Sequence, residues 1–320
     1  MELSPGHVVG GKYRIDAKLG EGGMGAVYKA WDTRLDRPVA LKVIRPALAQ
    51  DESFRARFER EAKAVARLKH PNAIEIYDYD HGDGGDGPIY MAFEFLEARE
   101  LSELIRAGEL TPLRTVWIVS QILSCLETAH RAGIIHRDLK PQNVMIERSD
   151  DRVKILDFGI AKMKNPETDV SLSPLTMAGQ VMGTVYYMSP EQAEGRSVDG
   201  RSDIYSVGVM LYLMLTGRLP FKSKKPIEIL DMHLHAPVPP LGAQHLAPFE
   251  PVVQKAMAKV PADRFASAAE FRAALESAVP AEAWGPAGRP APPGRAAHPG
   301  GPIPKTRASN RLASLEATPP

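Results

Sequence analysis

The sequence predicts an α+β protein with a β-rich first part, a mainly helical second part and a disordered tail. Residues 12–44 hold β-prone segments separated by turns, whereas apolar residues recur at helical spacing from residue 102 onward. Residues 280–320 are dominated by Pro, Ala and Gly. Short apolar segments between turns favour antiparallel strands, the longer period favours helices, and the tail has too few large apolar side chains to form a core.

Composition and charge narrow the possible functions. The chain has 320 residues, of which 44% are hydrophobic, and its formal net charge is +1. These values permit a sizeable core and give no sign of a nucleic-acid partner. The single cysteine, Cys125, is expected to be a small core residue. No signal peptide is visible, and the most apolar run, 207–215, is shorter than the roughly 20 residues that cross a bilayer. We therefore expect a cytoplasmic protein without a membrane span.

A glycine-rich turn separates the first two expected strands, which lie around Tyr13 and around Val27. It reads Gly20-Glu21-Gly22-Gly23-Met24-Gly25-Ala26-Val27. Glycines at such a turn let the backbone come close to a phosphate. A dinucleotide-binding loop would open a helix and place an acid about 20 residues on, but here β-prone residues follow and Lys42 stands near that position. No Gly-Lys-Ser/Thr follows either, so a Walker-type loop is excluded, and the glycine pattern alone is weak evidence.

The next expected elements are a strand over 39–44 and a helix over 51–69. Glu61 lies within the apolar stripe of that helix, and a charge on a buried face needs a partner. Lys42 lies within the apolar strand, and its pattern alone leaves it open whether it is functional or a solvated edge lysine. Strands are expected over 73–79 and 89–96, and a long helix from Thr111 to about His130.

A polar loop follows this long helix, and it carries the strongest signal in the chain. It reads His136-Arg137-Asp138-Leu139-Lys140-Pro141-Gln142-Asn143, and a second short motif, Asp157-Phe158-Gly159, follows the strand over 153–156. The strands after the first motif and before the second would pair, so Asp138, Asn143 and Asp157 could converge. Oxygen ligands of this kind suit a hard cation such as magnesium, although each residue singly could be a turn former.

Taken together, these motifs resemble the catalytic core of eukaryotic-like (Hanks-type) bacterial serine/threonine protein kinases, whose signatures are H-R-D-x-K-x-x-N and D-F-G. The resemblance covers about residues 10–278. It implies a bilobal protein-kinase fold with an antiparallel β-rich N-lobe, one main N-lobe helix and a mainly helical C-lobe. The implied divisions are an N-terminal extension (1–11), the N-lobe to the hinge (12–96), the C-lobe (97–279) and a disordered tail (280–320).

The resemblance also implies transfer of the γ-phosphate of ATP, with Mg²⁺, to serine and threonine hydroxyls of protein substrates. Asp138 would orient the acceptor hydroxyl and accept its proton, and Lys140 would stabilise the transferred group. Lys42 would contact the phosphates and pair with Glu61. The implied magnesium ligands are Asn143 and Asp157. The implied nucleotide contacts are Gly20, Glu21, Gly22, Gly23, Met24, Gly25, Val27, Ala40, Lys42, Glu94, Leu96 and Met145.

Other residues receive structural or regulatory expectations from the same resemblance. His136 would pack against Phe158. Residues 160–188 would form the activation segment, with Thr176 as the preferred autophosphorylation site and a homodimer as one route to phosphorylation in trans. Ser189-Pro190-Glu191 stands where the family more usually has Ala-Pro-Glu, and Glu191 would pair with Arg264. Asp203 would cap the central apolar helix and brace the catalytic loop.

Two other functions compete with this interpretation. A pseudokinase scaffold would bind nucleotide and partners without phosphoryl transfer, but the full set from Lys42 to Asp157 argues against it. A small-molecule kinase would share the fold, but the activation segment and the region 183–191, which would build a peptide-docking surface, argue against that.

Overall fold

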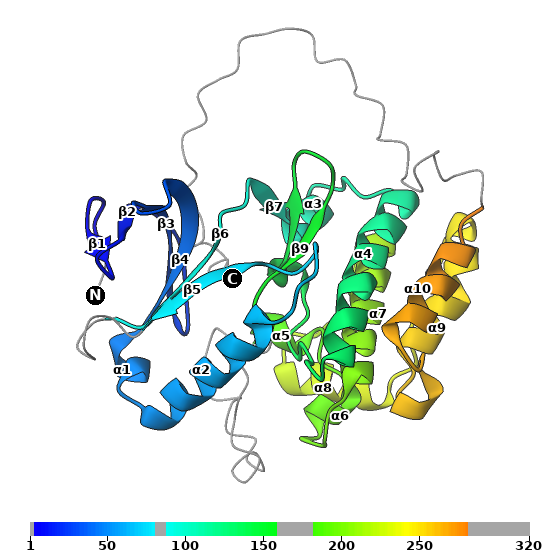
Figure 1. The fold of residues 1–320 in the computed structure, drawn as a ribbon. Coiled ribbons are helices and arrows are strands. Elements are labelled where there is room, and N and C mark those ends of the chain that lie inside the picture. The colour runs from blue at the N-terminus through cyan, green and yellow to red at the C-terminus, as the bar shows by residue number, and fades with distance from the viewer. Residues whose placement is uncertain (1–2, 81–87, 159–181, 281–320) are drawn as a thin grey trace, which may run out of the picture.

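The computed structural model describes residues 3–80, 88–158 and 182–280, and these form a β-rich lobe and a helical lobe joined by a small hairpin sheet (Figure 1). The strands are β1 (Val8–Val9), β2 (Tyr13–Gly22), β3 (Gly25–Asp32), β4 (Arg37–Ile44), β5 (Ile76–Asp80), β6 (Tyr90–Glu94), β7 (Ala98–Glu100), β8 (Val144–Glu147) and β9 (Val153–Ile155). The α-helices are α1 (Pro46–Ala49), α2 (Glu52–Ala66), α3 (Leu101–Arg106), α4 (Pro112–Arg131), α5 (Met182–Val185), α6 (Pro190–Ala193), α7 (Gly200–Thr216), α8 (Pro226–His235), α9 (Glu250–Ala256) and α10 (Ala268–Ser277). The described residues also form the short 3₁₀ turns η2 (Pro141–Asn143), η4 (Gln244–Phe249) and η5 (Pro261–Asp263).

The first lobe is an antiparallel sheet with strand order β1-β2-β3-β4-β6-β5, which confirms the predicted fold class. Period-two alternation separates its two faces. One face carries Tyr28 and Leu41 and packs with Leu3 and Val9, so the described part of the N-terminal extension covers this face. The opposite face carries Met91 and packs, with the apolar stripe of α2, into the main core that continues through the helical lobe.

A three-stranded sheet, β7-β8-β9, lies where the two lobes meet. The predicted pairing of the strands at 144–146 and 153–156 is confirmed, because Val144 pairs with Ile155. The strand predicted over 73–79 begins only at Ile76. The reason is that Ala73 forms a parallel bridge with Ile155 instead. In this bridge the Ile74 N–H donates to the Ile155 carbonyl at 3.0 Å, and the Ile155 N–H donates to the Asn72 carbonyl at 2.8 Å. This contact attaches the segment between α2 and β5 to the hairpin that precedes Asp157.

The helical lobe is built around α4 and α7, with α9 and α10 packed beside them (Figure 1). Pro112 takes the early position in α4 that the sequence predicts, and the Thr111 hydroxyl caps this helix. The predicted cap of α7 was wrong: Asp199 is the N-cap, and Asp203 lies one turn inside the helix. Cys125 on α4 is buried, and burial raises the pKa of its thiol to about 12, as expected for an inert core residue.

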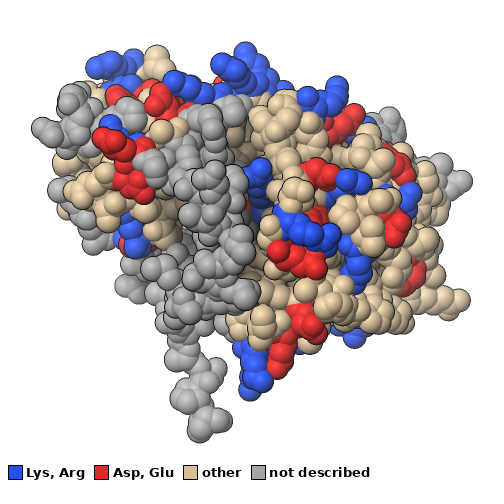
Figure 2. Space-filling model, turned by 90° about the horizontal axis from the view of Figure 1, so that it is seen from below, with Lys and Arg blue, Asp and Glu red and all other residues tan. Residues whose placement is uncertain are grey.

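The described surface carries charges of both signs. Figure 2 shows lysine and arginine side chains interspersed with aspartate and glutamate on the described part of one face, in keeping with the net charge of +1. Among the described residues, no helix has the length and apolar character needed to cross a membrane.

Candidate active site

A single buried carboxylate holds the loop between α4 and η2. Asp203 Oδ2 accepts from the backbone N–H of His136 at 2.9 Å and from the ring of His130 at 2.8 Å. Its Oδ1 accepts from the N–H of Arg137 at 2.9 Å. Arg137 itself adopts a left-handed backbone with φ of 64°. Three hydrogen bonds satisfy the Asp203 carboxylate, and the two from backbone N–H groups fix the chain immediately before Asp138.

The His136 ring links the two sequence motifs. It packs against Phe158 with ring centroids 4.9 Å apart, which confirms the expected contact. Its Nε2 donates to the Leu156 carbonyl at 2.9 Å, and its Nδ1 accepts from the Asp138 N–H at 3.3 Å. The ring is therefore a fully engaged structural element and not a general base.

Asp138 lies among polar groups that match its expected role. Lys140 Nζ lies 3.0 Å from Asp138 Oδ2 and 3.1 Å from the Thr184 hydroxyl, so one ammonium joins the loop to α5. The Asn143 amide nitrogen donates to the Asp138 carbonyl at 2.8 Å. This bond uses the amide nitrogen of Asn143, so its amide oxygen is the atom that could ligate a metal.

Lys42 and Asp157 come from different lobes and meet directly. Lys42 Nζ lies 2.7 Å from Asp157 Oδ1, although 115 residues separate them in the chain. Burial would raise the pKa of Asp157, but the Lys42 ammonium outweighs it, with a smaller contribution from His136, and the pKa is lower than usual. The carboxylate is therefore ionised at neutral pH. Its side chain keeps 36% of its surface exposed, so it remains accessible to a cation.

The expected ion pair between Lys42 and Glu61 stays a prediction. Glu61 lies on α2, but its side chain is outside the described residues. Lys42 is bound by Asp157 in this structure.

The described residues contain no cluster of three or more His, Cys, Asp or Glu side chains that could hold a metal. One carboxylate and one amide fit a magnesium ion that keeps waters and shares phosphate oxygens, which is the usual mode of that ion. Asp157 and Asn143 supply these two groups, so the donor set fits the metal that the resemblance implies.

The glycine-rich turn is a hairpin between β2 and β3. The carboxylate of Glu21 pairs with Lys18 and Arg45, and the carbonyl of Met24 accepts from the Arg45 N–H at 2.8 Å. A side chain at Gly22 would meet nothing within 4 Å. A side chain at Gly25 would lie 1.9 Å from the Val43 carbonyl oxygen, so this glycine serves strand packing. Gly20 pairs with Val27 across the two strands, and Gly23 lies in the turn of the hairpin.

Strand register brings three of the expected nucleotide-contact residues together, namely Val27 on β3 and Ala40 and Lys42 on β4. Val27 lies opposite Lys42, and Ala40 lies two residues before Lys42 on the same side of β4. Met145 on β8 lies opposite Lys154, and Leu96 packs against the main core after β6.

Lys154 was not singled out from the sequence, yet it holds the expected hinge. Its ammonium lies 2.7 Å from Glu94 Oε1, and the same oxygen accepts from the Glu75 N–H at 2.8 Å. The Glu94 side chain is therefore committed to structure. A nucleotide at this hinge would have to use the backbone, as the resemblance implies. The buried lysine before Asp157 was the available signal, because a lysine in an apolar strand needs a partner.

The expected substrate side of the site is only partly described. A small depression beside Asp138 is lined by residues that include Thr184, Tyr187 and Gln192. Residues 159–181, which include Thr176 and most of the expected activation segment, lie outside the described residues. The residues from 182 onward include the short helix α5, which the sequence did not predict.

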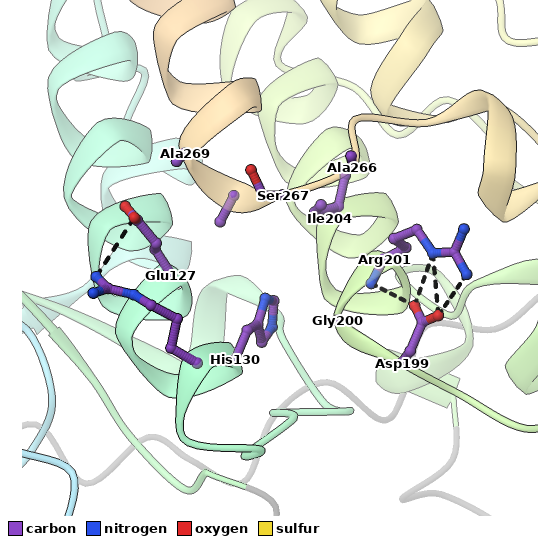
Figure 3. A pocket seen from close by; sticks show the side chains of 11 residues that line it. Glu127, His130, Asp199, Gly200, Arg201, Ile204, Ala266, Ser267 and Ala269 are labelled. Carbon is purple, nitrogen blue, oxygen red and sulfur yellow. Dashed lines mark hydrogen bonds and ion pairs between the residues drawn. The ribbon is translucent and has the colours of Figure 1, made fainter.

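A larger cavity, about 460 Å³, lies where the end of α4 meets the starts of α7 and α10 (Figure 3). His130 lines it and donates to Asp203, which in turn binds the catalytic loop. A side chain at Gly200 would lie 2.7 Å from His130 Nδ1, which explains why a glycine stands there. None of the expected catalytic or nucleotide residues lines this cavity.

Known proteins share this arrangement. The protein kinase domain family matches residues 13–269. The serine/threonine-protein kinase pkn3 of Myxococcus xanthus is 47% identical over 277 residues, covering 84% of this chain and 50% of pkn3. Serine/threonine-protein kinase PknB of Mycobacterium tuberculosis is 41% identical over 276 residues, covering 84% of this chain and 43% of PknB. The crystal structure of the Mycobacterium tuberculosis PknI kinase domain matches with a TM-score of 0.67 and 29% identity, covering 87% of this chain and 100% of that chain.

The chain therefore belongs to the protein kinase family. Within that family it groups with the eukaryotic-like bacterial serine/threonine kinases, which confirms the resemblance drawn from the motifs. Such a family implies ATP, a divalent metal and protein substrates. The chain spans half or less of the length of the curated relatives named above.

Proposed function

We propose that the chain is a serine/threonine protein kinase that transfers the γ-phosphate of ATP to protein hydroxyls. The observation that carries this proposal is the 2.7 Å contact between Lys42 and Asp157. It joins, across the two lobes, the lysine that we assign to the phosphates and the carboxylate that we assign to the metal. In this site Asp138 orients the acceptor hydroxyl and takes its proton. Lys140, bound to Asp138 and Thr184, supplies positive charge at the transferred group.

Magnesium is the metal that we propose. Asp157 and the amide oxygen of Asn143 would hold it, and a bound magnesium ion neutralises phosphate charge during transfer. The lowered pKa of Asp157 supports this assignment, because the carboxylate is ionised at neutral pH. The protein supplies position and charge, since phosphoryl transfer requires little covalent catalysis.

Autophosphorylation within residues 160–188 is part of the same proposal, with Thr176 as the preferred site and transfer between two copies of the chain as one route. Arg137 supports it, because a guanidinium beside the catalytic residue would pair with a phosphate on the neighbouring segment. Mass spectrometry after incubation with ATP should find phosphate between Asp157 and Glu191. Its absence there would contradict this part of the proposal.

A labelled-ATP assay tests the function. Purified chain with magnesium should label serine and threonine of a protein acceptor, and chelation by EDTA should stop the reaction until magnesium is restored. Asp138→Asn should lower the rate by at least about 100-fold, because the hydroxyl loses its proton acceptor. Its thermal unfolding midpoint should stay close to that of the wild type, since the substitution preserves shape.

The outcomes separate the competing functions. Equal labelling by the wild type and Asp138→Asn would refute the role of Asp138. Nucleotide binding by a wild type that never transfers phosphate would instead support a pseudokinase scaffold.

A further inference from the structure

The backbone before Asp138 is held from a second side, by a residue outside the kinase motifs. The Nε2 of Gln192, on α6, donates to the Arg137 carbonyl at 2.8 Å. Asp203 holds the N–H of the same residue at 2.9 Å. Arg137 has a φ of 64°, a conformation that non-glycine residues adopt only when their surroundings impose it. Both of its backbone polar groups are therefore fixed by side chains from two different helices.

The orientation of the Gln192 amide is itself determined. Its Oε1 accepts from the Ser189 N–H and from the Ser189 hydroxyl, each at 3.1 Å. The Ser189 hydroxyl in turn accepts from the Gln192 N–H at 3.4 Å, which completes a capping box on α6. Because two donors occupy the oxygen end, the NH₂ end of the amide faces the Arg137 carbonyl. Ser189 is fully buried, so water does not compete for these bonds.

This arrangement gives a role to the serine that replaces alanine in the usual Ala-Pro-Glu motif. Alanine has no side-chain oxygen to accept from the Gln192 N–H, so it could not complete this box. Gln192 also lines the depression beside Asp138, so the residue lies between the catalytic loop and the expected peptide-binding region.

We propose that Gln192, oriented by Ser189, is a positioning residue for phosphoryl transfer. It stabilises the left-handed conformation of Arg137 and thereby fixes the direction of the Asp138 side chain. The residue acts through the Arg137 carbonyl and touches neither nucleotide nor acceptor. This inference rests on the proposed function. The competing explanation is that Gln192 only caps the four-residue helix α6.

Two substitutions separate these explanations. Gln192→Glu preserves the capping box, because a carboxylate accepts from Ser189 as well as an amide does. It removes the donor to Arg137 and places an acceptor there. Gln192→Met has a similar size but loses both functions. We expect both variants to lose about tenfold in kcat, the effect of about one hydrogen bond. The KM for ATP should change less than about twofold, since no nucleotide contact is altered.

Each other pattern overturns the proposal. A Gln192→Glu enzyme that retains kcat while Gln192→Met loses it would show that capping alone matters. A Gln192→Met enzyme that retains kcat while Gln192→Glu loses it would show that repulsion, and not the lost donor, caused the change. Retention of kcat by both variants would show that the contact has no role.

A measurement without turnover distinguishes failure of this inference from failure of the proposed function. Hydrogen–deuterium exchange of a peptide covering 134–143 should become faster in both variants than in the wild type. A peptide from α10 should exchange at an unchanged rate and serves as the internal control. If the wild type transfers no phosphate, the proposed function fails. Unchanged exchange of the loop peptide in both variants would still overturn the role of Gln192.

Discussion

At the residue scale, several polar side chains lie buried inside the helical lobe. His233, on α8, is one of them: it is buried, and its Nδ1 lies 2.8 Å from the Tyr205 hydroxyl. Its ring also packs edge-on against Phe221. Burial lowers the pKa of His233 from 6.5 to about 4, and the nearby Lys259 ammonium adds to the effect. The folded protein therefore keeps this ring neutral.

This pKa predicts how stability depends on pH. Between pH 6.5 and about 4 the unfolded chain protonates His233 but the folded chain does not, so stability falls as the pH falls. Between pH 7.5 and 5, His233 should lower the free energy of unfolding by about 2 kcal/mol. Urea unfolding of His233→Gln should show a correspondingly smaller loss over this range. An equal loss in variant and wild type would contradict the prediction.

At the element scale, the hairpin of β2 and β3 uses its glycines for different physical reasons. Gly22 has open space around it, whereas Gly25 lies against the backbone of β4, where the Val43 carbonyl leaves no room for a side chain. In this motif, Gly25 is needed because two strands pack closely there, whereas Gly22 lies in an open turn. The spacing of glycines in the sequence does not show which glycine has which role.

This difference predicts opposite outcomes for two matched substitutions. Gly25→Ala should lower the free energy of unfolding by about 1–3 kcal/mol, because the new methyl group forces β3 away from β4. Gly22→Ala should change it by less than about 1 kcal/mol, since nothing lies near the added atom. Urea unfolding of both variants tests this, and similar losses would mean that the strands do not pack as described.

At the scale of the whole molecule, one buried ion pair joins distant parts of the helical lobe. Arg264 binds both carboxylate oxygens of Glu191 at 2.8 Å, across 73 residues of chain, as the sequence predicted. Arg264 also donates to the carbonyls of Ala258 and Arg201. Burial raises the pKa of Glu191, but the hydrogen bonds from Arg264 and Ser202 lower it by more than burial raises it. The pKa of Glu191 is therefore below its usual value.

Removing one partner should therefore be costly. Glu191→Gln should lower the free energy of unfolding by about 3–5 kcal/mol, because a buried guanidinium loses its counter-charge. A matched control is Glu270→Gln, which removes a 2.7 Å pair with Lys255 whose side chains are both 44% exposed. That variant should lose at most about 1 kcal/mol. Equal losses in urea unfolding would show that burial does not decide the strength of the pair.

The fold and the main site residues follow from the sequence because local patterns determine them. Examples are the alternation within strands, the start of α4 at Thr111 and the end of α7 at Gly217. Each of these depends on interactions within a few residues of the chain. The kinase motifs identify the candidate site residues, and the tertiary structure brings two of them, Lys42 and Asp157, to 2.7 Å. The domain boundaries and the individual catalytic roles remain predictions.

The tertiary structure alone decided the partners of several polar side chains. Lys154 binds the hinge residue Glu94 and Gln192 binds the Arg137 carbonyl, and neither contact was predicted. Asp203 binds the catalytic loop, as the resemblance implies, but it does not cap α7. Each bond joins segments that are far apart in the chain, so no local pattern records it. A buried polar group must find a partner, and the sequence shows that need. Only the packing of the helices and strands shows which donor or acceptor comes within reach.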